Sequence, residues 1–176
     1  MTVKPMIRSN ICINAHPAGC AREVENQIEY VRSKTASRGG PKAPCKAALV
    51  LGCSTGYGLA SRIEAAFAYG AATVGVSFEK EGSETRGGTP GWYNNLAFDR
   101  AAAASSLPSI TINGDAFSDA VRDQVIEAAK KLGVKFDAVI YSIASPVRTD
   151  PDTSVLYKSV LKPIGKQYAG QTVDPM

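Results

Sequence analysis

Apolar residues along the middle of the chain occur in two alternating patterns. Continuous apolar runs bounded by turn residues are typical of parallel strands that are buried on both faces. The segments between these runs place their apolar residues on one side of a helix. The predicted strands are residues 47–51, 71–78, 108–112 and 136–143, and the predicted helices are residues 59–69, 93–104 and 119–132. This alternation predicts a parallel sheet joined by right-handed crossovers.

The two ends of the chain have weaker patterns. Residues 2–15 alternate short apolar and polar positions, which indicates a short hairpin or an added edge strand. Residues 20–34 have the spacing of an amphipathic helix. Two prolines and a glycine pair mark residues 37–44 as a linker. Prolines return after residue 150, so we expect mostly loop there, with a short helix at residues 155–162.

A glycine-rich turn follows the first predicted strand. Gly52, Gly56 and Gly58 have the spacing GxxxGxG, which allows a tight turn, close approach of a pyrophosphate and close packing of helix on sheet. The free amides of the next helix would face the phosphates. Glu79 ends the second strand, where its carboxylate would bind the adenosine ribose and repel a 2′-phosphate. The pattern therefore predicts NADH rather than NADPH, a preference that Lys80, Arg62 and Arg100 could weaken.

A hydrolase pattern competes with this interpretation. Gly52, Ser54 and Gly56 also satisfy GxSxG, but a serine nucleophile of that kind needs a histidine later in the chain. The single histidine, His16, lies upstream. We therefore interpret Ser54, with Thr55 beside it, as a phosphate-binding hydroxyl, and His16 as a turn or packing residue.

A second catalytic pattern is also better explained by structure. Tyr30 and Lys34 form a YxxxK pair, as do the tyrosine and lysine of short-chain dehydrogenases. In those enzymes the pair follows the fourth strand, whereas here it precedes the first. We interpret it as a contact on the surface of a helix.

Two further strand ends are candidates for the same ligand. Open α/β sheets bind ligands at the carboxyl ends of their strands. Asp115 and Ala116 follow the third strand, where a carboxylate or a backbone amide could meet the adenine, although Asp115 could equally serve as a turn residue or helix cap. Ile143 and Ala144 follow the fourth strand, where small residues leave room for the nicotinamide ribose.

Composition narrows the class of protein. A length of 176 residues suits one domain, and 44% hydrophobic with 20% charged residues is ordinary for a globular protein. The net charge of +4 comes from scattered residues, which argues against a nucleic-acid partner. The four cysteines lack CxxC spacing and favour free thiols. No targeting segment or membrane-length apolar run is evident, so we expect a cytoplasmic protein without metal, membrane or nucleic acid.

These patterns predict an α/β fold with a Rossmann-like doubly wound parallel sheet. Residues 1–44 would be an N-terminal extension of hairpin, helix and linker. Residues 45–150 would form the dinucleotide-binding domain. Residues 151–176 would be a loop-rich C-terminal segment.

Several longer stretches resemble a known family. They are CSTGYGLASR at residues 53–62, GWYN at 91–94, NGDAFSD at 113–119, YSIASP at 141–146 and LKPIG at 161–165. Together they strongly resemble the trans-2-enoyl-CoA reductase family, which includes a class of bacterial NADH-dependent enoyl-ACP reductases. The resemblance covers the whole chain.

The resemblance implies a monomeric reductase of fatty acid metabolism with an enlarged Rossmann-like fold. In that family, hydride passes from NADH to the β-carbon of a trans-2-enoyl thioester of CoA or acyl carrier protein, and a tyrosine stabilises the enolate oxygen. The cofactor contacts carried over by position are Gly52, Cys53, Ser54, Thr55, Gly56 and Tyr57 at the pyrophosphate, Phe78 and Glu79 at the ribose, Asp115 and Ala116 near the adenine, and Ile143 and Ala144 near the nicotinamide.

The sequence differs from the family in its length. Its members are considerably longer, and the resemblance places their catalytic tyrosine and lysine beyond residue 176, so no residue here receives a catalytic role. We expect a truncated sheet in which residues 138–141 form an exposed edge, and no enoyl reductase activity from this chain alone. The alternative function is a non-catalytic NAD-binding module or redox sensor.

Overall fold

The computed structural model describes residues 7–8, 11–12, 14–40, 45–83, 86–160, 164–165 and 167. They belong to two compact units, Met1–Ile143 and Ala144–Met176. The first unit contains the sheet and the helices, and the second contains a hairpin.

The predicted parallel sheet is confirmed. Its strands are β3 (Ala47–Leu51), β4 (Ala72–Ser77), β5 (Ser109–Asn113) and β6 (Ala138–Tyr141), in the spatial order β5-β4-β3-β6. Every pairing is parallel, and Val50 lies opposite both Gly75 and Ile140. The chain moves outward from β3 to β5 and then returns to place β6 on the other side of β3. The switch point of this doubly wound sheet therefore lies between β3 and β6.

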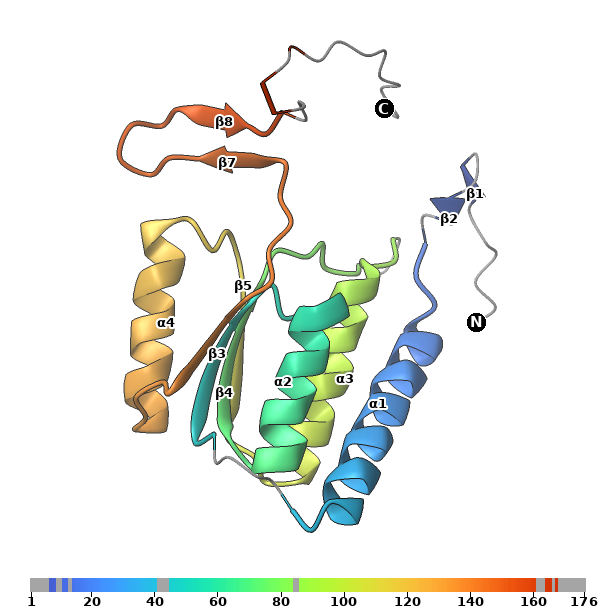
Figure 1. Ribbon diagram of the computed structural model, residues 1–176. Coiled ribbons are helices and arrows are strands. Elements are labelled where there is room, and N and C mark those ends of the chain that lie inside the picture. The colour runs from blue at the N-terminus through green and yellow to red at the C-terminus, as the bar shows by residue number, and fades with distance from the viewer. Residues whose placement is uncertain are drawn as a thin grey trace. The chain divides into compact units, whose positions relative to one another are not determined.

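Four helices cover the sheet in layers. α2 (Gly56–Tyr69) and α3 (Pro90–Ala104) lie on one face, with α1 (Pro17–Ser37) packed outside them, and α4 (Asp119–Leu132) lies on the opposite face (Figure 1). The bounds of α4 agree with the prediction. Each of the other helices begins three residues earlier than predicted. For α1 and α3 the reason is a proline at the helix start, where its missing N–H is tolerated.

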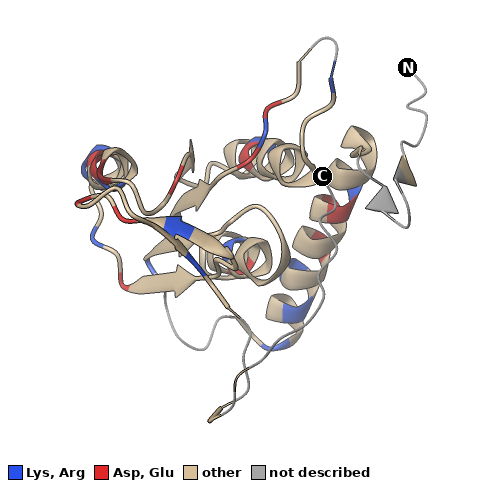
Figure 2. Ribbon diagram, turned by 90° about the horizontal axis from the view of Figure 1, so that it is seen from above, with Lys and Arg blue, Asp and Glu red and all other residues tan. Residues whose placement is uncertain are grey.

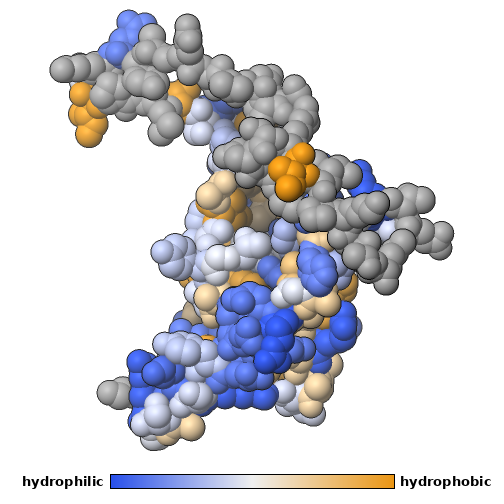
Figure 3. Space-filling model, turned by 90° about the vertical axis from the view of Figure 1, so that its right-hand side faces the viewer, coloured by the Kyte–Doolittle hydropathy of each residue, from blue (hydrophilic) through white to orange (hydrophobic). Residues whose placement is uncertain are grey.

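Apolar side chains fill both faces of the sheet. Val24 and Ile28 of α1 pack with Ile63 of α2 and Phe98 of α3, and the other face gathers a second cluster around Val76. The outward surface of α1 is hydrophilic (Figure 3). Acidic and basic residues are interspersed along α1 and α4 (Figure 2). Among the described residues, no helix has both the length and the apolar character that a membrane crossing requires.

The predictions for the two ends of the chain are only partly confirmed. β1 (Ile7–Arg8) pairs antiparallel with β2 (Ile11–Cys12), which confirms a hairpin within residues 2–15. Half of the predicted linker, residues 41–44, lies outside the described residues. In the second unit, β7 (Val147–Thr149) and β8 (Leu156–Lys158) also form an antiparallel hairpin.

The predicted helix at residues 155–162 is wrong where the structure describes it. Asp150 accepts the amide of Asp152 at 2.9 Å through its side chain and the amide of Ser154 at 2.9 Å through its carbonyl. Ser154 has a φ of +59°. Local hydrogen bonding by the Asp150 side chain thus closes a turn, and the following residues pair as a strand. Residues 161 and 162 lie outside the described part.

The exposed edge is confirmed at β6. This strand pairs only with β3 among the described strands. Its residues alternate between half-buried and exposed, and Val139 and Tyr141 are 64% and 61% exposed. An apolar strand at an open edge normally needs a covering element.

A buried arginine ties α2 to β5 and α3. The side chain of Arg62 is fully buried, and its guanidinium donates to Thr111 Oγ1 at 2.8 Å, Ser109 Oγ at 2.9 Å and the Ile110 carbonyl at 3.1 Å. It also lies 3.7 Å from Asp99 and 4.1 Å above the ring of Phe98. Arg62 is therefore committed to the core and is not available to weaken a cofactor preference at the surface.

We expect Arg62→Met to lower the free energy of unfolding by about 1–3 kcal/mol, because it leaves the hydroxyls of Ser109 and Thr111 and the Ile110 carbonyl without their donor. Arg22→Ala, which removes only exposed ion pairs, should cost about 0–1 kcal/mol. Urea unfolding followed by the fluorescence of Trp92 measures both. Equal losses in the two variants would contradict a stabilising role for the buried network.

Candidate cofactor site

The glycine turn is a place where three backbone segments meet. The amide of Gly52 donates to the Val76 carbonyl at 2.8 Å, so the turn is anchored on β4. Gly52 has a φ of +86°, and a Cβ there would lie 2.2 Å from the carbonyl oxygen of Ser142, just beyond β6. A Cβ on Gly58 would lie 1.9 Å from the Gly52 carbonyl oxygen. Both positions require glycine.

The same turn leaves an open approach at its tip. Gly56 has a φ of +53°, and a Cβ there would meet nothing within 4 Å. Thr55 is the N-cap of α2 but makes no side-chain capping bond. The first amides of a helix have no acceptor within the helix. The N-terminus of α2 is therefore uncapped by side chains, unlike α1, which is capped by His16, and α4, which is capped by Ser118.

Glu79 lies between the glycine turn and the start of α3. Ser54 Oγ donates to its Oε1 at 2.5 Å, and Thr89 Oγ1 donates to its Oε2 at 2.5 Å. The amide and carbonyl of Glu79 are both bonded to the side chain of Asn113, at 2.8 and 3.0 Å. The structure thus brings Ser54 and Glu79 together, as their predicted roles in one site require, and directs the Ser54 hydroxyl at the carboxylate.

Polar residues of α3 also hold the turn, and sequence reasoning missed them. Asn94 Nδ2 donates to the Ser54 carbonyl at 2.9 Å. Asn95 Nδ2 donates to Ser77 Oγ at 2.8 Å, and its Oδ1 lies 3.7 Å from Cys53 Sγ. Thr89 was missed as well, although a threonine followed by Pro90 is a recognisable helix start.

Cys53 lies beneath the turn and out of reach of solvent. It is fully buried, and burial raises the pKa of its thiol, which the positive charge of Arg62 only partly offsets. Burial likewise lowers the pKa of Arg62. Gly75 makes room for this pair, since a Cβ there would lie 2.6 Å from Arg62 Cζ and 2.7 Å from Cys53 Sγ. Cys53 thus contributes a packed side chain and its backbone to the site.

The remaining predicted residues differ in exposure and in their contacts. Tyr57 and Phe78 are 88% and 80% exposed. The Asp115 side chain accepts the amide of Phe117 at 2.9 Å, so its carboxylate serves the turn before α4. Ala116 and Ile143 are half-buried residues of the first unit, and Ala144 belongs to the second.

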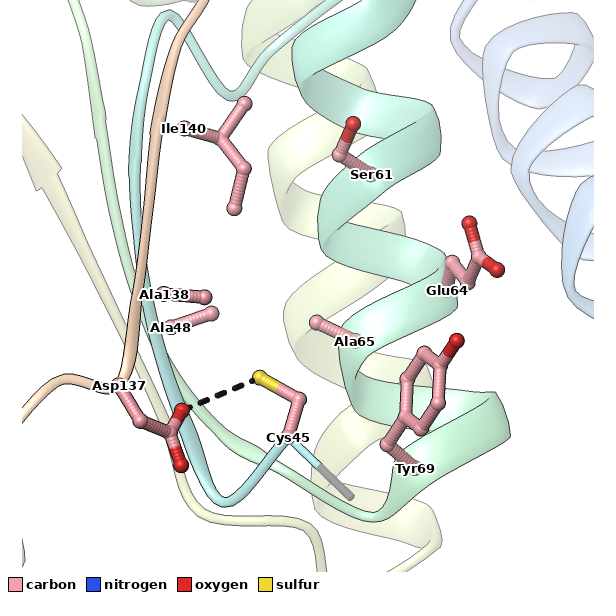
Figure 4. A pocket seen from close by; sticks show the side chains of 9 residues that line it. All are labelled: Cys45, Ala48, Ser61, Glu64, Ala65, Tyr69, Asp137, Ala138 and Ile140. Atoms are coloured by element: carbon pink, nitrogen blue, oxygen red, sulfur yellow. Dashed lines mark hydrogen bonds between the residues drawn. The ribbon is translucent and has the colours of Figure 1, made fainter. Parts of the chain in front are cut away.

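A separate cavity opens at the other end of the strands. It lies between α2 and the β3/β6 pair, where Cys45 and Asp137 point toward each other with Sγ 3.4 Å from Oδ1 (Figure 4). Asp137 accepts the amides of Lys46 and Ala47, which lowers its pKa, and burial and Asp137 raise the pKa of Cys45. Because parallel sheets bind ligands at their carboxyl ends, this cavity lies at the wrong end for the cofactor.

Fold and site together define a dinucleotide-binding α/β protein of the Rossmann type. Two family models match the chain: the NAD(P)H binding domain of trans-2-enoyl-CoA reductase at residues 2–84, and the trans-2-enoyl-CoA reductase catalytic region at residues 86–176. The chain belongs to the trans-2-enoyl-CoA reductase family, which confirms the resemblance found in its sequence.

Individual relatives agree with this assignment. The chain is 67% identical to a trans-2-enoyl-CoA reductase [NADH] of Treponema denticola, over 99% of this chain and 44% of the relative. It is 54% identical to an enoyl-[acyl-carrier-protein] reductase [NADH] of Idiomarina loihiensis, over 98% of this chain and 43% of the relative. The chain therefore spans less than half the length of these proteins.

Solved structures of relatives share the fold. The crystal structure of the Treponema denticola trans-2-enoyl-CoA reductase in complex with NAD matches with a TM-score of 0.89 at 66% identity, over 99% of this chain and 44% of that chain. The Clostridium acetobutulicum trans-2-enoyl-CoA reductase in complex with NADH matches with a TM-score of 0.85 at 39% identity, over 97% and 42%.

We expect Gly58→Ala to destabilise the protein by about 1–3 kcal/mol through overpacking against the Gly52 carbonyl, although alanine is the better helix former by about 1 kcal/mol. Gly70→Ala is the matched control, because Gly70 has a φ of +68° but nothing near its missing Cβ. It should cost only about 1–2 kcal/mol, from the left-handed backbone. Urea unfolding compares the two, and only Gly58→Ala should also alter nucleotide binding.

Proposed function

We propose that this chain is the cofactor-binding portion of an NADH-dependent reductase of trans-2-enoyl thioesters in fatty acid metabolism. The single observation that carries the proposal is the glycine turn, where Gly52 and Gly58 bring backbone to backbone and α2 begins without a side-chain cap. Family membership and relatives whose structures contain NAD or NADH support it. The thioester would be an enoyl-CoA or an enoyl-ACP. We further propose a cytoplasmic monomer that acts without nucleic acid.

The residues present fit a dinucleotide. Gly56 leaves the tip of the turn open, and the first amides of α2 would donate to the pyrophosphate. Cys53, Thr55 and Tyr57 would complete that contact together with the backbone of Ser54, whose hydroxyl is directed at Glu79 and not at the phosphate. We propose Phe78 and Glu79 for the adenosine ribose, Asp115 and Ala116 for the adenine, and Ile143 and Ala144 for the nicotinamide, within the dinucleotide-binding domain proposed at residues 45–150.

Glu79 would decide which nicotinamide cofactor binds. A carboxylate accepts hydrogen bonds from both ribose hydroxyls but repels a 2′-phosphate. Of the three basic residues that could offset this repulsion, Arg62 is fully buried in the core, whereas Lys80 and Arg100 are exposed. Bound NADH would supply the hydride that reduces the thioester β-carbon. The chain's own residues would bind and orient the cofactor, and we place no residue of this chain as proton donor.

Cofactor selectivity tests the role of Glu79. We expect titration calorimetry to show tighter binding of NADH than of NADPH. Glu79→Gln should lower NADH affinity by about 1.5–3 kcal/mol, roughly ten- to a hundredfold, since hydrogen bonds to a charged group are lost. Glu64→Gln is the control on the same unit, because Glu64 is an exposed residue beside the separate cavity. Tighter binding of NADPH than of NADH by the unaltered chain would overturn the role of Glu79.

Catalysis by the chain itself is a separate test. We expect the purified 176-residue chain to bind NADH yet not to oxidise it with crotonyl-CoA, because protonation of the product needs a donor that we do not assign here. Absorbance at the NADH band follows the reaction. Measurable crotonyl-CoA reduction by this chain would show that a tyrosine or another group of the chain supplies the proton.

A further inference from the structure

The carboxylate of Glu79 is fixed by two hydroxyl groups from different segments. Ser54, in the glycine turn, donates to one oxygen, and Thr89, before α3, donates to the other. Each contact measures 2.5 Å, at the short end of the range for a hydroxyl that donates to a carboxylate. Because each oxygen accepts a hydrogen bond from a different segment, the carboxylate is held in one orientation.

Thr89 holds the carboxylate instead of its own helix. It occupies the N-cap position of α3, where a threonine hydroxyl usually accepts an amide of the first turn, but it makes no side-chain capping bond. Its hydroxyl has one hydrogen, and the Glu79 carboxylate lies closer than the alternative acceptor, the Lys80 carbonyl at 3.3 Å. A threonine at this position normally caps its own helix, but here the hydrogen bond to Glu79 replaces the capping bond.

The surroundings of Glu79 are shaped for this one orientation. A Cβ on Gly91 would lie 2.2 Å from Glu79 Oε1 and 2.8 Å from Ser54 Cβ, so glycine at this position leaves space for the carboxylate in its observed orientation. Asn113 fixes the backbone of Glu79 at both its amide and its carbonyl. Side chain and backbone of Glu79 are therefore both held by groups outside its own strand.

We propose that Ser54 and Thr89 are positioning residues that set the ribose selectivity of this site through Glu79. The proposal rests on the proposed function, in which Glu79 meets the adenosine ribose. An ionised carboxylate offers about four acceptor positions. Ser54 and Thr89 occupy one on each oxygen, which leaves one on each oxygen for the two ribose hydroxyls.

The fixed direction also explains why a 2′-phosphate would be rejected. A carboxylate that is free to rotate can move away from a phosphate and reduce the repulsion, whereas one held at both oxygens cannot. Loss of either hydroxyl should weaken the binding of NADH, because both ribose contacts of Glu79 become less well oriented. For NADPH, the reduced repulsion would be offset by the weaker contact to the remaining ribose hydroxyl, so its already weak binding should change little. The two affinities would converge.

The test compares Thr89→Val, which replaces the hydroxyl by a methyl group of similar size, with Thr89→Ser, which keeps the hydroxyl. Ser54→Ala removes the other donor. Binding of NADH and NADPH by the 176-residue chain is measured by calorimetry, and thermal unfolding is recorded for each variant. We expect Thr89→Val and Ser54→Ala to weaken NADH binding about five- to tenfold, with NADPH binding changed less than about twofold. Thr89→Ser should restore most of the selectivity.

A double-mutant cycle separates an effect through Glu79 from a general effect on the loop. In a Glu79→Ala background, Thr89→Val should have no further effect on the ratio of the two affinities. If Thr89→Val leaves the ratio of NADH to NADPH affinity unchanged, whether both affinities fall equally or neither changes, the positioning role is overturned and the proposed function stays intact. If the unaltered chain binds neither nucleotide, the proposed function fails, and this inference fails with it.

Discussion

The structure depends on a close backbone contact at the carboxyl end of β3. Gly52 meets the carbonyl of Ser142, and Gly58 meets the carbonyl of Gly52, at distances that exclude any side chain. This contact joins the central strand, the first crossover helix and the segment after β6 at the switch point of the sheet. Because it fixes where α2 begins, it also fixes where the amides of α2 point, and those amides would form the anion-binding part of the proposed site.

Polar contacts extend this constraint across the unit. Asn94 and Asn95 connect α3 to the turn, and Asn113 connects the end of β5 to the end of β4. Beneath them, Arg62 links α2 to β5 and to Asp99. Buried polar groups are costly unless every partner is present, so this network favours one arrangement of the turn. Among the described residues, no buried side-chain polar atom lacks a partner.

The sequence predicted how strands and helices alternate along the chain, because each of these segments has a strong local pattern. The helix at Asp119–Leu132 has an N-cap serine, an apolar face and a terminal glycine, and its bounds agree with the prediction. The hairpin at β7 and β8 was missed, because a turn closed by Asp150 outweighed a weak helical pattern. The other three helices begin three residues before their predicted starts. Their first residues are proline or glycine, which the sequence pattern assigned to the preceding loop.

The sequence by itself determined the Rossmann-like sheet, the glycine turn and the position of Glu79 at a strand end, since spacing along the chain encodes all three. Only the tertiary structure decided what the side chains of the site contact. Ser54 and Thr89 are 35 residues apart yet donate to the same carboxylate, and Arg62 turned out to be a core residue. Local patterns follow from one segment's own hydrogen bonds and burial, whereas these contacts arise only when strands and helices distant in sequence pack together.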